Sequence, residues 1–127
     1  MPIEILIPLN NVPGTVAKVA ETLGKAGVNL QGIGYPTGAR GVLRVIANES
    51  TKALAALKAA KLNVRQTKEV LVLSIPDEPG ALGAVARKLA KARVNIEAFY
   101  VVGSDSGRLR VVFAVDKLDK AKTIVGL

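Results

Sequence analysis

The side chains able to carry out acid–base or nucleophilic chemistry are few in this sequence, and they lie apart. The chain contains no His and no Cys, so the commonest general base and the thiol nucleophile are both absent. The serine hydroxyls stand at an expected helix start, in a strand or in a turn, outside any G-x-S-x-G sequence: Ser50, Ser74, Ser104 and Ser106. The sequence therefore predicts a protein without catalytic residues.

Carboxylates and glycines likewise form no recognisable metal or cofactor motif. The acidic pairs do not follow metal-ligand spacing: Asp77 with Glu78, and Asp116 with Asp119. Asp116 is instead expected to cap a helix. Gly32-Ile33-Gly34 is followed next by Gly38, which breaks the G-x-G-x-x-G spacing of a dinucleotide loop. These glycines are expected to permit close approach of another backbone across an interface. We therefore expect no metal and no cofactor.

The positive charge of the chain suggests a different class of function. Lys and Arg outnumber Asp and Glu by 18 to 10, which gives a net charge of +8 and a pI near 10.1. Nucleic acids and acidic proteins are the partners that such a balance favours. However, segments 42–46 and 109–113 lack the exposed aromatic pattern of RNA-binding sheets. The densest basic group is typical of a solvated helix face: Arg87, Lys88, Lys91 and Arg93. A basic nucleic-acid- or acidic-partner-binding module therefore ranks second.

The sequence repeats itself at a spacing of 66 residues. Pro13-Gly14 corresponds to Pro79-Gly80, and Val28-Asn29 corresponds to Val94-Asn95. The segment 41–45 likewise corresponds to 107–111, which gives Arg44 and Arg110 the same place in the two copies. Each of these arginines is either a surface charge on the sheet or a donor between units. The repetition indicates a duplication.

Each copy alternates strand-like and helix-like patterns in the same order. The β-rich runs 3–9 and 70–75 end at turn residues. Pro13 and Pro79 then stand where proline opens a helix, and apolar residues follow at helical spacing. A second helix is expected from Ser50 or Thr51 in the first copy and after Asp116 in the second. The remaining strands are expected at 29–35, 42–47 and 64–67, and at 95–102 and 108–115.

This β-α-β-β-α-β order predicts an α+β chain of two ferredoxin-like units in tandem, with antiparallel sheets and helices on one face. We place the first unit at 1–68 and the second at 69–127. The sequence reaches Leu127 where the last strand of the second unit should start, so that unit is expected to lack this strand. Its sheet then keeps an open edge or takes a strand from another chain.

The apolar pattern of the first strands indicates further contacts. Segments 5–7 and 70–73 are apolar on both faces, whereas a strand with one wet face alternates. The second face of each sheet is therefore expected to be covered by the other copy or by another subunit, as in a homodimer or larger oligomer. No apolar stretch reaches membrane-spanning length and the first residues lack a secretory pattern, so we expect no membrane association and a cytoplasmic location.

Two short motifs, each present twice, resemble the signature of ACT domains. Asn11-Val12-Pro13-Gly14 and Asp77-Glu78-Pro79-Gly80 each follow a strand and open a helix. The starts of the next strands, 27–30 and 93–96, also match the family pattern. ACT domains are regulatory βαββαβ modules that bind amino acids, and the resemblance covers nearly the whole chain. It implies a small regulatory protein without an attached catalytic domain, which binds an amino-acid effector and acts on an enzyme of amino-acid biosynthesis.

The resemblance also implies where the effector lies. In the family the effector usually sits between two ACT units, held by the loop before the first helix and by the start of the second strand. The corresponding positions here are Asn11, Val12, Pro13, Gly14, Asn29 and Leu30 in the first copy, and Asp77, Glu78, Gly80, Asn95 and Ile96 in the second. A carboxamide can donate to the carboxylate of an amino acid and accept from its ammonium group. The loop glycines allow close approach, and helix N-terminal N–H groups suit a carboxylate.

Some positions depart from the family pattern or have a simpler explanation. Family members that use a His four residues before the proline have Leu9 and Ile75 here. Asp77 would attract the ammonium group of an amino acid but repel its carboxylate, to which the Asn11 carboxamide could donate, so the two sites are not expected to bind equally or to bind the same ligand. Pro-Gly is also a common helix-opening turn, and the two strand-opening Asn residues could be turn residues only.

Overall fold

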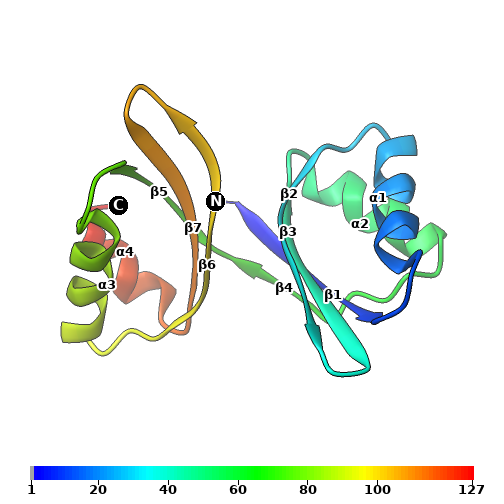
Figure 1. Cartoon of the computed structure of the whole chain (residues 1–127), viewed down its shortest axis with the longest axis horizontal. Helices are drawn as coiled ribbons and strands as arrows, with labels where there is room; N and C mark the ends of the chain where they lie inside the picture. Colours follow the sequence, from blue (N-terminus) through cyan, green and yellow to red (C-terminus); the bar gives the residue numbers. More distant parts are fainter. Residues whose placement is uncertain (1) are drawn as a thin grey trace. The chain divides into compact units, whose positions relative to one another are not determined.

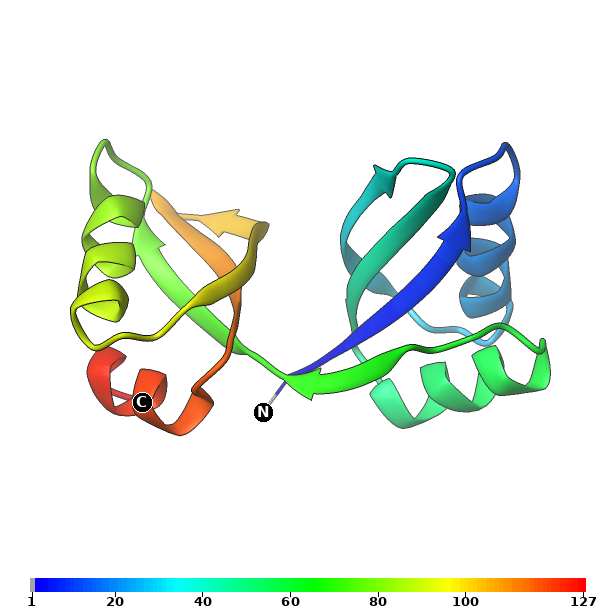
Figure 2. The same ribbon diagram turned by 90° about the horizontal axis from the view of Figure 1, so that it is seen from below.

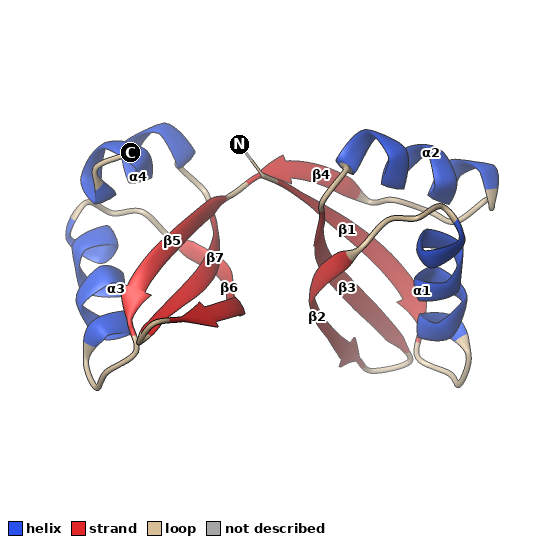
Figure 3. Ribbon diagram, turned by 90° about the horizontal axis from the view of Figure 1, so that it is seen from above, coloured by secondary structure: helices blue, strands red, loops and turns tan. Residues whose placement is uncertain are grey.

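The computed structural model describes residues 2–127, which fold as two compact units (Figure 1). The first unit is Ile3–Lys68, and the second is Glu69–Leu127 together with Pro2. In each unit an antiparallel sheet carries two helices on the same face, as Figures 2 and 3 show. This arrangement confirms the predicted α+β fold of two ferredoxin-like units in tandem.

The first unit has the complete β-α-β-β-α-β order. Its elements are β1 (Ile3–Asn10), α1 (Thr15–Lys25), β2 (Leu30–Thr37), β3 (Arg40–Ala47), α2 (Ser50–Ala59) and β4 (Gln66–Glu69). The strands are arranged as β2-β3-β1-β4, so β2 lies at one edge of the sheet. Every residue of β2 except Leu30 is exposed.

The second unit has the same order without a last strand in the described part of the chain. Its elements are β5 (Leu71–Pro76), α3 (Ala81–Lys91), β6 (Ile96–Asp105), β7 (Arg108–Val115) and α4 (Leu118–Val125). The strands are arranged as β5-β7-β6, a sheet of three strands. The position of β6 in this sheet corresponds to that of β2 in the first.

Aliphatic side chains form the two cores between helices and sheets. The periodicity of Val19 and Leu23 turns one stripe of α1 toward the sheet, where both side chains are almost fully buried. They contact strand residues of matching parity: Ile5, Ile7, Leu43 and Val45. In the second core Phe113 is fully buried and takes the place that Val45 has in the first. Burial of these apolar side chains is the main stabilising contribution to each unit.

The repeat does not keep one spacing through the whole of each copy. Strand β6 has 10 residues where β2 has 8, and its pairing with β7 is interrupted between Ile96 and Ala98 and between Val101 and Gly103. Each interruption inserts one extra residue in β6 relative to β7, as in a β-bulge. The spacing therefore changes from 66 to 68 residues along β6.

This change makes the predicted equivalence of Arg44 and Arg110 wrong. Arg44 lies opposite Leu6 on β1, and the residue opposite the corresponding Val72 is Val112. Arg110 lies opposite Ser74 instead. The two arginines therefore occupy different places in the two sheets, although the sequences around them look alike.

The helices also begin later than the prolines suggested. α1 begins at Thr15 after Gly14, and α3 begins at Ala81 after Gly80. Both glycines have positive φ values, 93° and 86°, which an L side chain rarely adopts. The Pro-Gly pair therefore forms the turn before the helix, and the proline is not the first helical residue.

Candidate functional site

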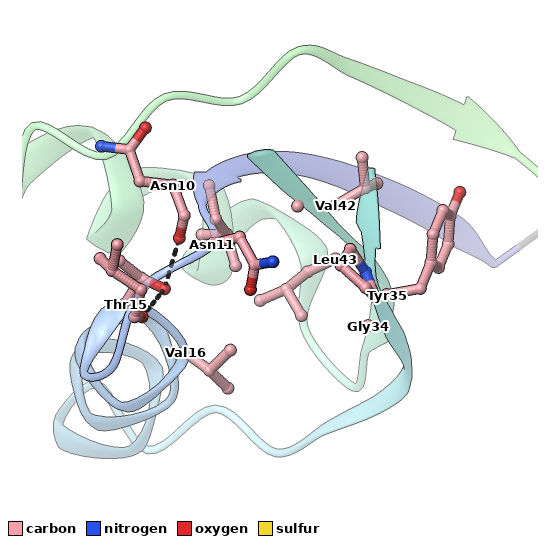
Figure 4. A pocket seen from close by; sticks show the side chains of 12 residues that line it. Asn10, Asn11, Thr15, Val16, Gly34, Tyr35, Val42 and Leu43 are labelled. Atoms are coloured by element: carbon pink, nitrogen blue, oxygen red, sulfur yellow. Dashed lines mark hydrogen bonds between the residues drawn. The ribbon is translucent and has the colours of Figure 1, made fainter. Parts of the chain in front are cut away.

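A cavity of about 430 Å³ opens between α1 and the edge strand β2 of the first unit (Figure 4). The loop and helix side consists of Asn10, Asn11, Val12, Thr15 and Val16. The strand side consists of Leu9, Gly34, Tyr35, Pro36, Gly41, Val42 and Leu43. Apart from the Tyr35 phenol, no side chain in this lining is ionisable. The cavity is therefore apolar, with polar groups gathered on the loop.

Hydrogen bonds hold the loop in place. The Thr15 hydroxyl lies 2.9 Å from the carbonyl oxygen of Asn10 and 3.1 Å from that of Val12, so it can donate to either (Figure 4). The side-chain amide of Asn11 donates to the carbonyl oxygen of Gly38 at 3.0 Å, and the backbone N–H of Asn11 donates to the carbonyl oxygen of Ala39 at 2.9 Å. These bonds tie the loop to the turn between β2 and β3. They also use a donor of the Asn11 carboxamide and leave its oxygen as an acceptor at the cavity.

A cation lies at the rim of the cavity. Arg40 Nη1 donates to the side-chain oxygen of Asn10 at 3.0 Å, and both residues are exposed. The guanidinium therefore adds positive charge beside the loop without lining the cavity. Its effect on a ligand is reduced by solvent and salt.

A second cavity of about 290 Å³ continues the first along α1 and β2. The two share Val16, Gly34 and Leu43, and the second reaches Leu30 near the start of β2. A Cβ atom on Gly32 would collide with the carbonyl oxygen of Arg44, and one on Gly34 would lie 2.6 Å from Leu43 Cδ2. Glycines at these positions let the strands approach closely and keep this wall of the groove free of side chains.

The structure brings only some of the predicted site residues together. Asn11 and Val12 line the first cavity, and Leu30 lines the second. Pro13 and Gly14 form the turn before α1 and line neither cavity. Asn29 lies outside both cavities, just before the start of β2.

The backbone of Asn29 is clamped by Asn48, which follows β3. The N–H of Asn29 donates to Asn48 Oδ1 at 3.1 Å, and its carbonyl oxygen accepts from the N–H of Asn48 at 3.2 Å. Asn95 and Asp116 make the same pair of bonds in the second unit, at 2.9 and 3.2 Å. The prediction that Asp116 caps a helix is therefore wrong, because Lys117 precedes α4 and the Asp116 carboxylate binds the start of β6.

The predicted residues of the second unit lie in matching places. Asp77, Glu78 and Gly80 are exposed in the loop before α3, and the N–H of Asp77 donates to Gly107 at 2.9 Å. Ile96 packs against the core of that unit. The second unit thus repeats the backbone of the loop with acidic side chains on it.

Several cavity residues could not be found from the sequence. Thr15, Tyr35 and Leu43 carry no recognisable motif, because each follows the ordinary pattern of its helix or strand. Gly32 and Gly34 stand out in the sequence only as a failed dinucleotide motif. Their position on an edge strand, which could have indicated an open groove, becomes clear only from the order of the strands.

An ion pair lies on the other face of the same sheet. Arg44 Nη2 donates to Glu4 Oε1 at 2.9 Å, with side-chain exposures of 11% and 1%. Burial alone would lower the pKa of the Arg44 guanidinium, but hydrogen bonds to Glu4 and Tyr35 and the negative charge of Glu4 hold the pKa above its usual value. Arg44 is therefore a partly buried ion-pair partner, and of the two alternatives that the sequence left open, the surface charge is wrong.

The described residues offer neither a metal site nor a membrane span. No group of three or more His, Cys, Asp or Glu side chains in 2–127 could hold a metal ion. Within the same range, no helix is long and apolar enough to cross a membrane.

Comparisons with known proteins agree on the fold. The family described as "ACT domain pair" matches residues 2–127. The structure of protein BT0572 from Bacteroides thetaiotaomicron is similar to this chain, with a TM-score of 0.89, 30% identity, and coverage of 98% of this chain and 85% of that one. The ligand-free regulatory subunit of aspartate kinase from Thermus thermophilus has a TM-score of 0.72 at 20% identity, with coverage of 98% and 91%. No curated protein matches the chain significantly.

Proposed function

The chain belongs to the ACT domain pair family, and on that premise we propose that it is a non-catalytic regulatory protein that binds a free amino acid. The observation that carries this proposal is the uncharged cavity between α1 and β2, which meets the polar loop before α1. Its volume of about 430 Å³ suits one small ligand. We place the effector there, with Asn11 as its principal side-chain contact.

The loop supplies groups of the kind that an amino acid needs. The Asn11 oxygen can accept from the ammonium group, because the amide nitrogen of the same side chain is held by Gly38. The first N–H groups of α1, near Thr15 and Val16, can donate to the carboxylate. A zwitterion would thus meet an acceptor and donors at one end of a cavity whose other walls are apolar.

The open side of the groove suggests how the site is completed. Strand β2 is at a sheet edge and exposed along most of its length, so its backbone can pair with another chain. We propose that a unit of a second copy covers this edge in a homo-oligomer, and that the effector lies at the interface between ACT units. Asn29, which lies away from Asn11 within its own unit, would then contribute to a neighbouring site.

The regulated partner is proposed from the structural neighbours. One of them is named as the regulatory subunit of aspartate kinase. We propose that this chain likewise acts on an amino-acid biosynthetic enzyme, from a cytoplasmic location. If binding of the effector changes the affinity of this chain for the enzyme, binding of the enzyme must change its affinity for the effector by the same factor.

Thermal unfolding of the full chain against each of the twenty amino acids tests the proposal. A ligand that binds only the folded state stabilises it by about 2.7 kcal/mol at a concentration of 100 times its Kd. We expect one or a few amino acids to raise the Tm, and Asn11→Ala to remove the rise. Asn63→Ala, an exposed Asn outside this cavity, is the matched control and should keep it.

Two results would count against this function. If no amino acid changes the Tm, the cavity is not an effector site. If short oligonucleotides raise the Tm in a salt-sensitive manner while amino acids do not, the net charge of +8 reflects nucleic-acid binding instead.

A further inference from the structure

The two units differ at the wall of the groove next to the edge strand. The pairing registers place Gly32 opposite Val45 and Gly34 opposite Leu43 in the first unit. The corresponding pairs in the second unit are Phe99 with Phe113 and Val101 with Val111. Two positions without side chains in one unit are therefore occupied by a ring and a branched side chain in the other.

In the second unit side chains stand at these positions, with Phe99 49% and Val101 55% exposed. The rings of Phe99 and Phe113 are stacked, with centroids 6.2 Å apart. Leu82, which corresponds to Val16 in the repeat, packs against the core of its unit. Val16 is instead 54% exposed and lines both cavities of the first unit. The strand wall of the groove is bare in the first unit, whereas in its counterpart it carries two half-exposed apolar side chains, Phe99 and Val101, beside the partly buried Leu82.

The loops before α1 and α3 also differ between the two units. The first unit presents Asn11, Val12 and Thr15, which are uncharged. The second unit has Asp77, Glu78 and Ala81 at the corresponding positions. Two carboxylates would attract the ammonium group of an amino acid but repel its carboxylate from the start of the helix, and Ala81 lacks the hydroxyl with which Thr15 holds its loop.

We infer that the effector site is confined to the first unit and that it takes a neutral amino acid with an aliphatic side chain, such as valine, leucine or isoleucine. This inference rests on the proposed function and adds the unit and the class of ligand. The side chain of the ligand would lie along the glycine wall, against Val16 and Leu43. A charged side chain would lose its hydration there without meeting an opposite charge, since the lining carries none.

Calorimetric titration of the full chain with valine, leucine, isoleucine, aspartate and lysine tests the inference. We expect aliphatic amino acids to bind with no more than one site per chain. The affinity for valine should differ from that for leucine or isoleucine, which carry one more methylene group, by about 10- to 200-fold, as is usual in an apolar pocket. Aspartate and lysine should bind more weakly than the best aliphatic ligand by at least that factor.

Substitutions made in each unit test which of the two units binds the effector. Gly34→Val reproduces Val101 and should weaken aliphatic binding at least about tenfold. Val16→Phe fills the same space from an exposed helical position, so it keeps the test valid if Gly34→Val does not fold. Val101→Ala and Asp77→Ala, the controls in the second unit, should leave affinity unchanged.

The outcomes distinguish this inference from the proposed function. Preferential binding of a charged amino acid, two sites per chain, or loss of binding in Val101→Ala would overturn the inference while an amino-acid effector remained. Unchanged aliphatic affinity in both folded Gly34→Val and Val16→Phe would also overturn it. Absence of binding by any amino acid would overturn both proposals.

Discussion

The buried ion pair between Glu4 and Arg44 predicts a large loss of stability from a nearly isosteric change. Glu4→Gln keeps the shape of the side chain and removes its charge. The Arg44 guanidinium, 11% exposed, would then remain in the sheet without a carboxylate, and its Nε already has no hydrogen-bond partner among the described residues. Breaking a buried pair by removing one partner costs about 3–5 kcal/mol.

The exposure of the ion pair indicates how large the loss of stability should be. Because Arg44 retains some contact with solvent, we expect a value near the lower limit, about 3 kcal/mol. For a domain of 60 to 100 residues each kcal/mol lowers the Tm by about 4–8 °C, so unfolding of the first unit should shift by about 12–24 °C. A loss of this size is a large part of the stability of a small domain.

The ion pair also predicts how the effect depends on pH. The pKa of Arg44 is held above its usual value, so its contribution to stability is fully present below the unfolded-state pKa and is lost only as pH rises through the higher folded value. Titration of Arg44 should therefore add no pH dependence to stability between pH 5 and pH 9.

Urea unfolding followed by circular dichroism at pH 7 measures the change, with the m-value as a check that the same surface unfolds. The double variant Glu4→Leu with Arg44→Met is the control. It removes both charges, so its free energy of unfolding should be no more than about 1 kcal/mol below that of the original chain, or higher. If the free energy of unfolding of Glu4→Gln lies within about 0.5 kcal/mol of that of the original chain, the ion pair is not desolvated in solution and the reasoning fails.

Two further predictions concern the turns that position the groove. Gly14→Ala should destabilise the first unit by about 1–2 kcal/mol in urea unfolding, because φ at Gly14 is 93°. Gly24→Ala, inside α1 and facing open space, should stabilise it by about 0.5–1 kcal/mol, and equal effects of the two changes would contradict this account. Asn48→Ala removes the bond to the N–H of Asn29 and should cost about 1 kcal/mol, with faster amide hydrogen exchange at Asn29. Unchanged exchange there would show that the clamp is not formed.

Local features of the sequence were sufficient for the order of the elements. Alternating apolar residues predict strands, and Val19 and Leu23 at helical spacing predict α1, because these patterns depend only on the geometry of one element. The repeated Pro-Gly pairs located the turns before both helices, although Gly14 and Gly80 place each helix start two residues after the proline. The absence of His and Cys is a property of composition alone, so the expectation that the chain lacks the commonest general base and the thiol nucleophile needed no tertiary structure.

The pairing between strands could not be obtained in the same way. An ungapped comparison matches Arg44 with Arg110, because Gly, Leu, Arg and Val recur at the same places in 41–45 and 107–111. Two β-bulges in β6 shift the pairing by two residues and separate these positions. A shift of two keeps every side chain on its face of the sheet, so the apolar pattern gave no sign of it.

The sequence by itself determined the duplication, the β-α-β-β-α-β order and the residues of the loop before α1, since each of these depends on neighbours along the chain. Only the tertiary structure decided that β2 is an edge strand, that Gly32 and Gly34 leave a groove beside α1, and that Phe99 and Val101 take the corresponding strand positions in the second unit. It also decided that Glu4 and Arg44 form a buried pair. These features arise from contacts between residues far apart in sequence, which no local pattern records.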